Sequence, residues 1–325
     1  MSVNRSLRAA LTGAALVAII SPAAAQEWPT RAITAISPFS AGNANDIVGR
    51  VVLDPVSKQL GQPIVVENRP GGGGSIGANA VAKAAPDGYT ILLHSSSFSA
   101  EVVLHKTLPY DPLGDFTAVI PFGAQPSVLV AAPSKGFKTV ADIVAAAKAK
   151  PGSLNFASAG VGSASHMAAE RFRVSAGFTA QHIPFRGPAE AFAEVMAGRI
   201  DFYFLPIAPA LPVVADGTLM ALAVSTPERA PALPNVPTTA EAGFPGASYL
   251  FWGGLFVPKK TPNSIVVRLH DETKKALQLP AVQERLSKVG VQPLPMTTEQ
   301  FEKFFRDDVA VTVKLAKEIG IKPLD

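Results

Sequence analysis

The chain has 325 residues, of which 48% are hydrophobic, a formal net charge of +4 and no cysteine. The absence of cysteine excludes disulfides, thiolate metal sites and cysteine nucleophiles. The charge is too small and too evenly spread for a protein that binds nucleic acid or a membrane surface. A chain of this length and composition can bury enough apolar surface for two domains.

The first 25 residues predict a signal peptide. Arg5 and Arg8 make a basic start, residues 11–20 form an apolar stretch too short to span a bilayer, and residues 23–25 are small residues typical of a cleavage site. Removal of residues 1–25 lowers the net charge to +2, because the segment carries two arginines and no acid. Since Pro, Gly or charge interrupts every later apolar run, we expect an exported, soluble protein.

The loop at residues 37–46 is the first candidate binding element. It follows an apolar run at 32–36 that predicts a strand and precedes residues 47–60, whose spacing predicts a helix. A small, polar loop at the start of a helix leaves backbone N–H groups free to bind an anion. The alternative is an ordinary connection with Asn45 or Asp46 as the N-cap.

A second loop of similar composition, residues 159–166, lies far along the chain and also precedes a predicted helix. If the fold brings the two loops face to face, they form a clamp for one carboxylate.

A glycine-rich run at residues 68–77 follows a predicted strand at 63–67 and precedes an Ala-rich helix at 78–85. The run matches both the dinucleotide-binding pattern and the nucleophile-elbow pattern. The next strand, residues 89–93, lacks the acidic residue that a dinucleotide site needs, and Ser75 is too far from its strand for an elbow. We therefore predict that the glycines allow the backbone to approach a neighbouring segment.

Three serines, Ser95, Ser96 and Ser97, follow the strand at 89–93, at the end where open α/β sheets bind ligands. Their hydroxyls can donate to a carboxylate or act as turn and cap residues. Residues 108–116 predict an ordered turn, and the Pro-rich residues 121–126 predict a passage into the next strand.

A second series of strands and helices predicts a second α/β domain. Its expected strands span residues 127–132, 153–157, 181–184, 200–204 and 219–224. Its expected helices span residues 140–149, 189–197 and 207–215, with another helix ending at residue 175. A Pro- and Gly-rich linker or cover at 227–245 leads to a strand at 249–257, and helices at 262–277, 281–289 and 297–319 should pack on the first domain.

The predicted architecture is α/β with two lobes and a ligand cleft. Lobe 1 comprises residues 26–123 and 248–325, and lobe 2 comprises residues 124–247. Two crossings, near 121–126 and 245–252, make a hinge that lets the lobes close on a ligand.

Five polar or aromatic residues are candidates for chemistry or binding. His166 is a polar neighbour of the second loop, a hydrogen-bonding group at a helix start, or a catalytic base. Asp46 and Asp201 could act as acid and base only if the fold joined them across the cleft. Arg186 can receive a carboxylate or be a solvated loop residue, and Phe39 can stack on a ligand or belong to the core.

Metal and cofactor sites are not predicted. None of the five histidines stands with another at the spacing of zinc ligands on one helix.

The ordered set of segments resembles the Bug (Bordetella uptake gene) family, the substrate-binding proteins of tripartite tricarboxylate transporters. The resemblance spans the mature chain and rests on the segments 38–46, 65–77, 85–90 and 108–112, on Gly162-Ser163 with His166, and on Phe185-Arg186-Gly187 with Asp201. It implies a type II periplasmic binding protein fold, a periplasmic location and delivery of a carboxylated solute to integral membrane transporter subunits.

The resemblance also implies ligand contacts at Phe39, Ser40, Ala41, Gly42 and Asn43, at Ser95 and Ser97, and at Ala159, Gly162 and Ser163. We add His166, Arg186 and Asp201 as candidate ligand-binding residues. Asn43 replaces the usual second glycine of the first loop, and Leu205-Pro206-Ile207 stands where many relatives carry Asp or Asn. The second departure favours a more apolar acid over an amino acid.

The sequence thus predicts a monomeric, non-enzymatic receptor for a small organic mono- or dicarboxylate, aromatic acids included. The alternatives are a secreted hydrolase that uses Ser75 or Ser163 and a ligand-sensing partner of a histidine kinase.

Overall fold

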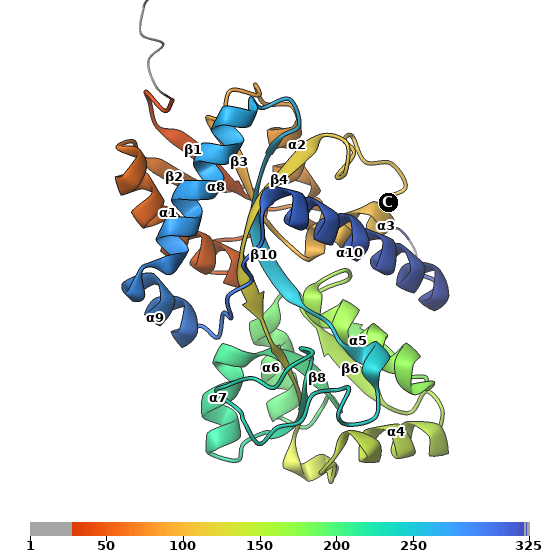
Figure 1. Ribbon diagram of the computed structural model, residues 1–325. Helices are drawn as coiled ribbons and strands as arrows, with labels where there is room; N and C mark the ends of the chain where they lie inside the picture. Colours follow the sequence, from red (N-terminus) through yellow and green to blue (C-terminus); the bar gives the residue numbers. More distant parts are fainter. Residues whose placement is uncertain (1–27, 322, 324–325) are drawn as a thin grey trace, which may run out of the picture.

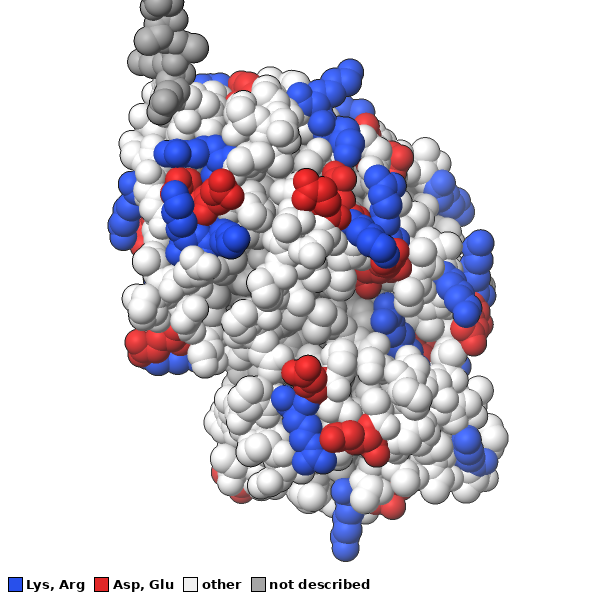
Figure 2. All heavy atoms as spheres, viewed as in Figure 1, with Lys and Arg blue, Asp and Glu red and all other residues white. Residues whose placement is uncertain are grey.

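The structure, a computed structural model, describes residues 28–321 and 323 and has mixed α/β architecture (Figure 1). The predicted signal peptide lies outside the described residues. The chain forms one larger sheet and a second group of shorter strands, which occupy opposite ends of the molecule in Figure 1. On the face drawn in Figure 2, Lys and Arg lie interspersed with Asp and Glu over both parts.

The larger sheet has five strands in the order β2-β1-β3-β10-β4. The strands are β1 (Ile33–Ser37), β2 (Ile64–Asn68), β3 (Thr90–Ser95), β10 (Phe251–Pro258) and β4 (Phe116–Gln125). β1 is parallel to β2 and β3, whereas β10 is antiparallel to β3 and β4. The carboxyl ends of β1 and β3 therefore meet at one edge, where the first loop and the serine run begin.

Helices cover both faces of this sheet. One face packs against α1 (Ala44–Leu60), α8 (Asn263–Gln278) and α9 (Pro280–Lys288). The other face packs against α2 (Ser75–Ala82), α3 (Ser97–Leu104) and α10 (Thr298–Ile319). The second core is rich in aromatic rings, with Phe98 of α3 stacked on Phe305 of α10 at 5.1 Å between centroids.

The second group of strands begins after Pro126. β5 (Ser127–Ala131) lies between β8 (Tyr203–Pro206) and β9 (Met220–Val224), and β6 (Asn155–Ser158) pairs in parallel with β7 (Gln181–Pro184). A single bridge from Phe156 to Phe202 joins β6 to the start of β8. Four helices complete this part: α4 (Val140–Ala149), α5 (Ala164–Ala176), α6 (Pro188–Met196) and α7 (Ile207–Ala215).

Two elements differ from the sequence predictions. β4 occupies residues that were predicted to form a turn and a Pro-rich passage. α3 begins at the end of the serine run, where no helix was predicted. β4 tolerates Pro121 because it is the last strand of the sheet and its pairing with β10 shifts at Gly253/Gly254, opposite that proline.

The C-terminal helix α10 has the predicted extent, but it packs on more of the molecule than predicted. α10 packs on β4 and α3 as expected, but its last turns reach α5, and Leu315 joins the core of the second group. Near this junction, Arg171 of α5 lies 3.6 Å from Asp308 of α10, and Asp308 accepts hydrogen bonds from Ser99 and Trp252. The two parts of the chain are thus linked by α10 as well as by the two strand crossings.

Candidate functional site

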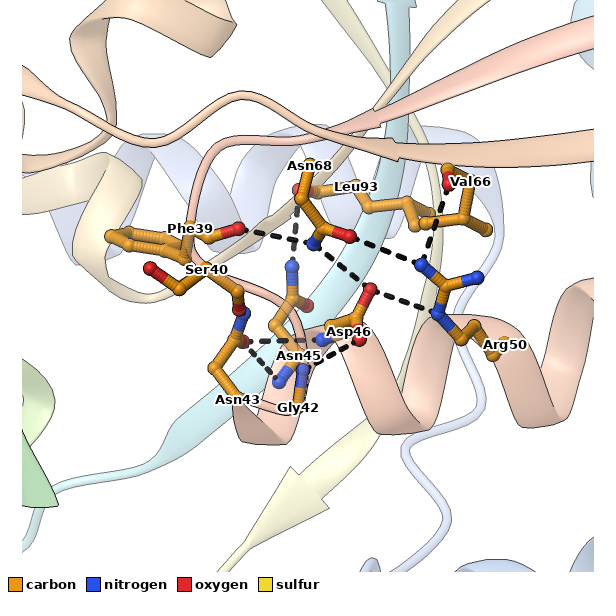
Figure 3. A network of polar contacts seen from close by, with 10 residues as sticks. All are labelled: Phe39, Ser40, Gly42, Asn43, Asn45, Asp46, Arg50, Val66, Asn68 and Leu93. Atoms are coloured by element: carbon orange, nitrogen blue, oxygen red, sulfur yellow. Dashed lines mark hydrogen bonds and ion pairs between the residues drawn. The ribbon is translucent and has the colours of Figure 1, made fainter. Parts of the chain in front are cut away.

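Asn43 shapes the first loop (Figure 3). Its Oδ1 accepts hydrogen bonds from the N–H groups of Asn45 (2.9 Å) and Asp46 (3.1 Å), and its Nδ2 donates to the carbonyl of Ser40 (2.6 Å). Asn43 is therefore the N-cap of α1, and the prediction of Asn45 or Asp46 was wrong. Gly42 completes the turn with φ of 80°, a conformation that disfavours other residues.

The carboxylate of Asp46 holds this loop in place through hydrogen bonds. Its Oδ2 accepts a hydrogen bond from Gly42 N–H, and its Oδ1 accepts from Arg50 Nε and Asn68 Nδ2, all at 2.9–3.0 Å. Asn68 Nδ2 also donates to the carbonyl of Phe39. Burial opposes the charged form of Asp46, but the hydrogen bonds from Gly42, Arg50 and Asn68 together hold its pKa below the usual value. Asp46 is thus a fixed carboxylate within the loop.

Backbone donors of the first loop, Ser40 and Ala41 among them, stay unused within the described residues. The N–H groups of Ser40 and Ala41 have no acceptor in residues 28–321 and 323, and both residues are exposed. They lie beside the N-terminus of α1, whose dipole favours negative charge. The loop therefore presents fixed donors to an anion.

A buried polar network lies under Phe39. The ring of Phe39 packs edge-on against His94, at 5.6 Å between centroids. His94 Nδ1 accepts a hydrogen bond from Ser95 N–H, so its Nε2 carries the proton and donates to Glu101 at 2.8 Å. Tyr110 donates its hydroxyl proton to the same carboxylate. His94 and Glu101 are completely buried.

The glycine run lies against this network, and the predicted close approach of its backbone to a neighbouring segment is confirmed. A Cβ on Gly74 would lie 2.4 Å from Glu101 Oε1, and a Cβ on Gly77 would lie 2.8 Å from Pro38. The glycines therefore let the backbone approach the network and the base of the first loop.

The serine run is buried beside the network. Ser95 and Ser97 hydrogen-bond to each other at 2.9 Å, and Ser96 accepts a hydrogen bond from the hydroxyl of Tyr249. Burial raises the pKa of Tyr249, which therefore stays protonated and can donate. These hydroxyls are engaged with protein atoms in this conformation.

The second loop is held mainly by its own side chains. Ser163 caps α5 by accepting from His166 N–H and donates to the carbonyl of Gly160 at 2.7 Å. The N–H of Ala159 donates to Ser165 Oγ, and the N–H of Gly162 donates to His166 Nδ1. Two backbone donors that the family resemblance assigns to a ligand are thus engaged inside the loop.

His166 supports this loop from the buried side. It stacks on His182 with 4.0 Å between ring centroids, and His182 hydrogen-bonds to Ser158 at 2.6 Å. Burial, with smaller contributions from His182 and Arg173, lowers the pKa of His166 to about 3, and burial lowers the pKa of His182 to about 4. Both rings are neutral near pH 7, which suits the acceptor role of His166 Nδ1.

α3 connects the two loops. Phe39 packs on His94 just before the helix, and the last residue of the helix, Leu104, lies against Gly162 of the second loop. A Cβ on Gly160 would lie 3.6 Å from the carbonyl of Phe185, which places the turn that carries Arg186 beside the second loop. Arg186 is exposed, and its N–H donates to Glu190.

Asp201 does not lie with these residues. Its carboxylate pairs with Lys135 at 2.7 Å and accepts from Asn155 N–H at 2.8 Å. Asn155 begins β6, whereas the second loop follows the other end of that strand. Asp46 and Asp201 belong to separate networks, so we exclude the acid–base pair and leave Asp201 out of the proposed site.

In the segment Leu205-Pro206-Ile207, which departs from the family pattern, Leu205 and Ile207 are buried and Pro206 is half-buried. Leu205 belongs to the core around β5, and Ile207 packs against Gly290, where a Cβ would lie 2.1 Å from Ile207 Cγ2. These residues serve packing between α7 and the segment after α9 in this conformation.

Three residues that support the loops were not predicted from the sequence, namely Asn68, Glu101 and Tyr110. Tyr110 and Asn68 lie in segments that the family resemblance had singled out, but their partners are distant in sequence. No helix in residues 28–321 is both long and apolar enough to cross a bilayer. The same residues contain no cluster of three or more His, Cys, Asp or Glu side chains suited to a metal ion.

Comparisons with known proteins extend over most of the chain. Residues 48–321 match the family described as "Tripartite tricarboxylate transporter family receptor" (TctC). Protein BugT of Bordetella pertussis is 34% identical over 324 residues, which cover 99% of each chain.

Two solved structures carry carboxylates in their descriptions. "R. palustris Rpa4515 with adipate" has a TM-score of 0.82 and 31% identity, covering 92% of this chain and 100% of that chain. "MatC (Rpa3494) from Rhodopseudomonas palustris with bound malate" has a TM-score of 0.78 and 32% identity, covering 89% and 99%. These likenesses confirm the predicted fold class.

Proposed function

Because this chain belongs to the Bug, or TctC, family of tripartite tricarboxylate transporter receptors, we propose that it is a periplasmic receptor for a small organic carboxylate. The ligand lies between two lobes, comprising residues 26–123 with 248–325 and residues 124–247. The receptor delivers it, as a monomer and without catalysis, to integral membrane transporter subunits.

The first loop supports this proposal most directly. Ser40 and Ala41 offer N–H groups that have no acceptor among the described residues, at the start of a 17-residue helix. Asn43, Asp46 and Asn68 hold these donors in place before any ligand arrives. Preorganised donors bind an anion without the entropic cost of ordering the loop.

The second loop supplies the opposite side of the proposed site. It meets α3 at Leu104, and its cap residue Ser163 starts α5, a second helix N-terminus. A ligand that touches both loops binds the closed arrangement better than the open one and therefore favours closure.

The related structures with adipate and malate motivate the ligand class. We infer a mono- or dicarboxylate, with Arg186 as the group that receives a second acid. Phe39, which sits over a rigid buried network, provides an aromatic surface for the body of the ligand.

Neither serine of the hydrolase alternative, Ser75 or Ser163, is paired with a base. Ser163 Oγ is hydrogen-bonded to Gly160 and to His166 N–H, while the acceptor nitrogen of the His166 ring is used by Gly162. No imidazole nitrogen within the described residues hydrogen-bonds to Ser75. An activated serine requires such a contact.

A thermal-shift screen tests the proposed function. The panel pairs each mono- or dicarboxylic acid with its neutral amide of the same chain length. A ligand that binds only the folded state raises the melting temperature as its concentration increases. We expect shifts from some of the acids and none from their amides. A panel without any acid-specific shift, or with equal shifts from the amides, argues against carboxylate recognition.

A further inference from the structure

A cavity lies away from both loops, along the outer edge of β4. It has a volume of about 600 Å³, which is within the range of small-molecule sites. We call it the β4-edge pocket and define it by its apolar lining residues Ile120, Phe122, Leu286, Val291, Leu294 and Met296. Neither loop of the proposed carboxylate site contributes to its lining.

The sequence after α9 explains why this pocket exists. The segment at residues 291–298 runs along the free edge of β4 and is attached at two points. Gln292 exchanges two backbone hydrogen bonds with Ala124, and the hydroxyl of Thr298 donates to the carbonyl of Val119. Pro293 and Pro295 lie between these attachments and have no N–H to donate. The segment therefore cannot pair continuously with the strand, and a space remains over Ile120 and Phe122.

The charges around the pocket favour one class of guest. Its lining includes Lys274 and His270 and no aspartate or glutamate. His270 is already engaged, since its ring nitrogens hydrogen-bond to Asp271 and to the carbonyl of Met296. Lys274 on α8 is exposed and forms no ion pair within residues 28–321 and 323, since Glu272 of the same helix pairs with Arg268 and Lys275. The wall is thus apolar, with one available cation at its rim.

We propose that the β4-edge pocket is a second binding site for an amphipathic monocarboxylate, with its hydrocarbon body on β4 and its acid group at Lys274. Burial of the chain supplies most of the affinity, because the lining is mainly apolar. The pocket should bind a carboxylate more tightly than an ammonium ion of the same chain length, because Lys274 repels the ammonium group and no carboxylate in the lining attracts it. This site is independent of the carboxylate site between the loops.

Methionine methyl groups can report the two sites separately in one sample. The chain has five methionines, of which Met296 lines the pocket and Met167 lies in α5 behind the second loop. We would label the methyl groups with ¹³C and titrate the protein with octanoate, octylammonium and octan-1-ol. Octanoate should shift the Met296 signal saturably, and octylammonium should bind about fivefold more weakly because it gains no ion pair.

Two matched pairs of variants locate the binding. Ser287→Trp places a ring in the pocket from an exposed position, whereas Arg285→Trp places the same ring on α9 outside the lining. Lys274→Glu reverses the rim charge, whereas Lys148→Glu makes the same change on α4. S287W should abolish the Met296 response to octanoate and K274E should weaken it about fivefold or more, while the two controls should leave it unchanged.

The outcomes distinguish binding in the β4-edge pocket from binding between the two loops. If octanoate shifts Met167 but not Met296, it binds only between the loops and the proposal is overturned. Equal affinity for octanoate and octylammonium, or an unchanged Met296 response in S287W, overturns it as well. A Met296 response that persists in Gly42→Asp, a variant of the first loop, supports the second site even if carboxylate binding between the loops fails.

Discussion

Leu104 of α3 and Gly162 of the second loop are so close that a Cβ on Gly162 would lie 2.1 Å from Leu104 Cδ1. Leu104 belongs to the part of the chain built on the larger sheet, and Gly162 belongs to the other part. The contact therefore joins the two proposed lobes at the proposed site. Since Gly162 also has φ of 76°, both sterics and backbone conformation require glycine there.

Gly162→Ala should weaken binding of a carboxylate ligand by about tenfold, or 1.4 kcal/mol. The added methyl group pushes the second loop away from α3 and so opposes closure. Gly177→Ala is the control, because Gly177 ends the same helix with φ of 65° and has no atom near its Cβ position. It should cost about 1 kcal/mol of unfolding free energy and leave affinity unchanged. Equal affinity in the two variants, measured by calorimetry, contradicts a role for this contact in binding.

Gly42→Asp should weaken carboxylate binding by about tenfold, because it places a negative charge at the N-terminus of α1. Gly42 has no atom within 4 Å of its Cβ position, so the change acts through charge and backbone conformation. Gly42→Asn separates these effects, since asparagine tolerates positive φ without adding charge. Gly136→Asp, at φ of 76° with open space, repeats the strain and the charge far from the loops. If calorimetry finds that G42D and G42N weaken carboxylate binding equally, the added charge does not cause the loss of affinity.

Much of the local structure could be predicted from the sequence, because the strands and helices follow apolar spacing and Gly or Pro boundaries. The observed bounds of α4, β7 and α7 coincide with the predicted ranges. β4 escaped prediction because a proline such as Pro121 usually ends a strand, and its edge position and shifted pairing with β10 accommodate it here. The two loops were predicted because a small, polar segment before a helix leaves backbone N–H groups free to bind an anion.

The contacts that support the loops could not be predicted. Asn68 reaches Phe39 over 29 positions, and Gly162 meets Leu104 across the two parts of the fold. Such contacts depend on how the elements pack, and periodicity along the chain does not encode their partners. The sequence thus predicts where the two loops lie in the chain. Which of their N–H groups are already hydrogen-bonded within the protein can be seen only in the three-dimensional structure.

The stability contributed by Asp46 should disappear in acid. Its pKa is lower in the folded protein than its usual value of 3.8, so its contribution is fully present above pH 4 and declines as the pH falls through the folded pKa. Asp46→Asn should lower the unfolding free energy by about 1–2 kcal/mol at pH 7. Denaturant titrations of both proteins from pH 7 to pH 2 should converge at the acidic end. Asp54→Asn, on an exposed ion pair of the same helix, should change stability by less than about 0.5 kcal/mol. If the unfolding free energy of D46N stays below that of the unsubstituted protein by the same amount at every pH, the charge of Asp46 does not supply this stability.

Glu101 should couple folding stability to ligand affinity through Phe39. Glu101→Gln replaces one acceptor oxygen with an amide donor and leaves His94 or Tyr110 without its acceptor, at a cost of about 1–3 kcal/mol. Tyr110→Phe removes one of the competing donors, so the double variant should lose less than the sum of the single losses. Affinity should fall with stability in E101Q if the network positions Phe39. Unchanged affinity in a folded E101Q protein would restrict the network to a structural role.

Arg186→Ala should affect diacids and spare monoacids. The guanidinium is exposed beside the second loop, so it can receive a carboxylate at the far end of a ligand whose first acid group is held by the first loop. Adipate and hexanoate form a matched pair, because they share a six-carbon chain and differ in the second acid group. Since the site is exposed, we expect about a fivefold loss for adipate and none for hexanoate. Arg186→Lys keeps the charge without the planar fork and should recover part of the adipate affinity.

An equal loss of affinity for both acids would make the effect of Arg186→Ala structural, and no loss for either would place Arg186 outside the binding site. A loss confined to adipate, together with partial recovery in R186K, would mean that the second loop recognises the far end of the ligand through charge, while the first loop holds the near end through backbone donors.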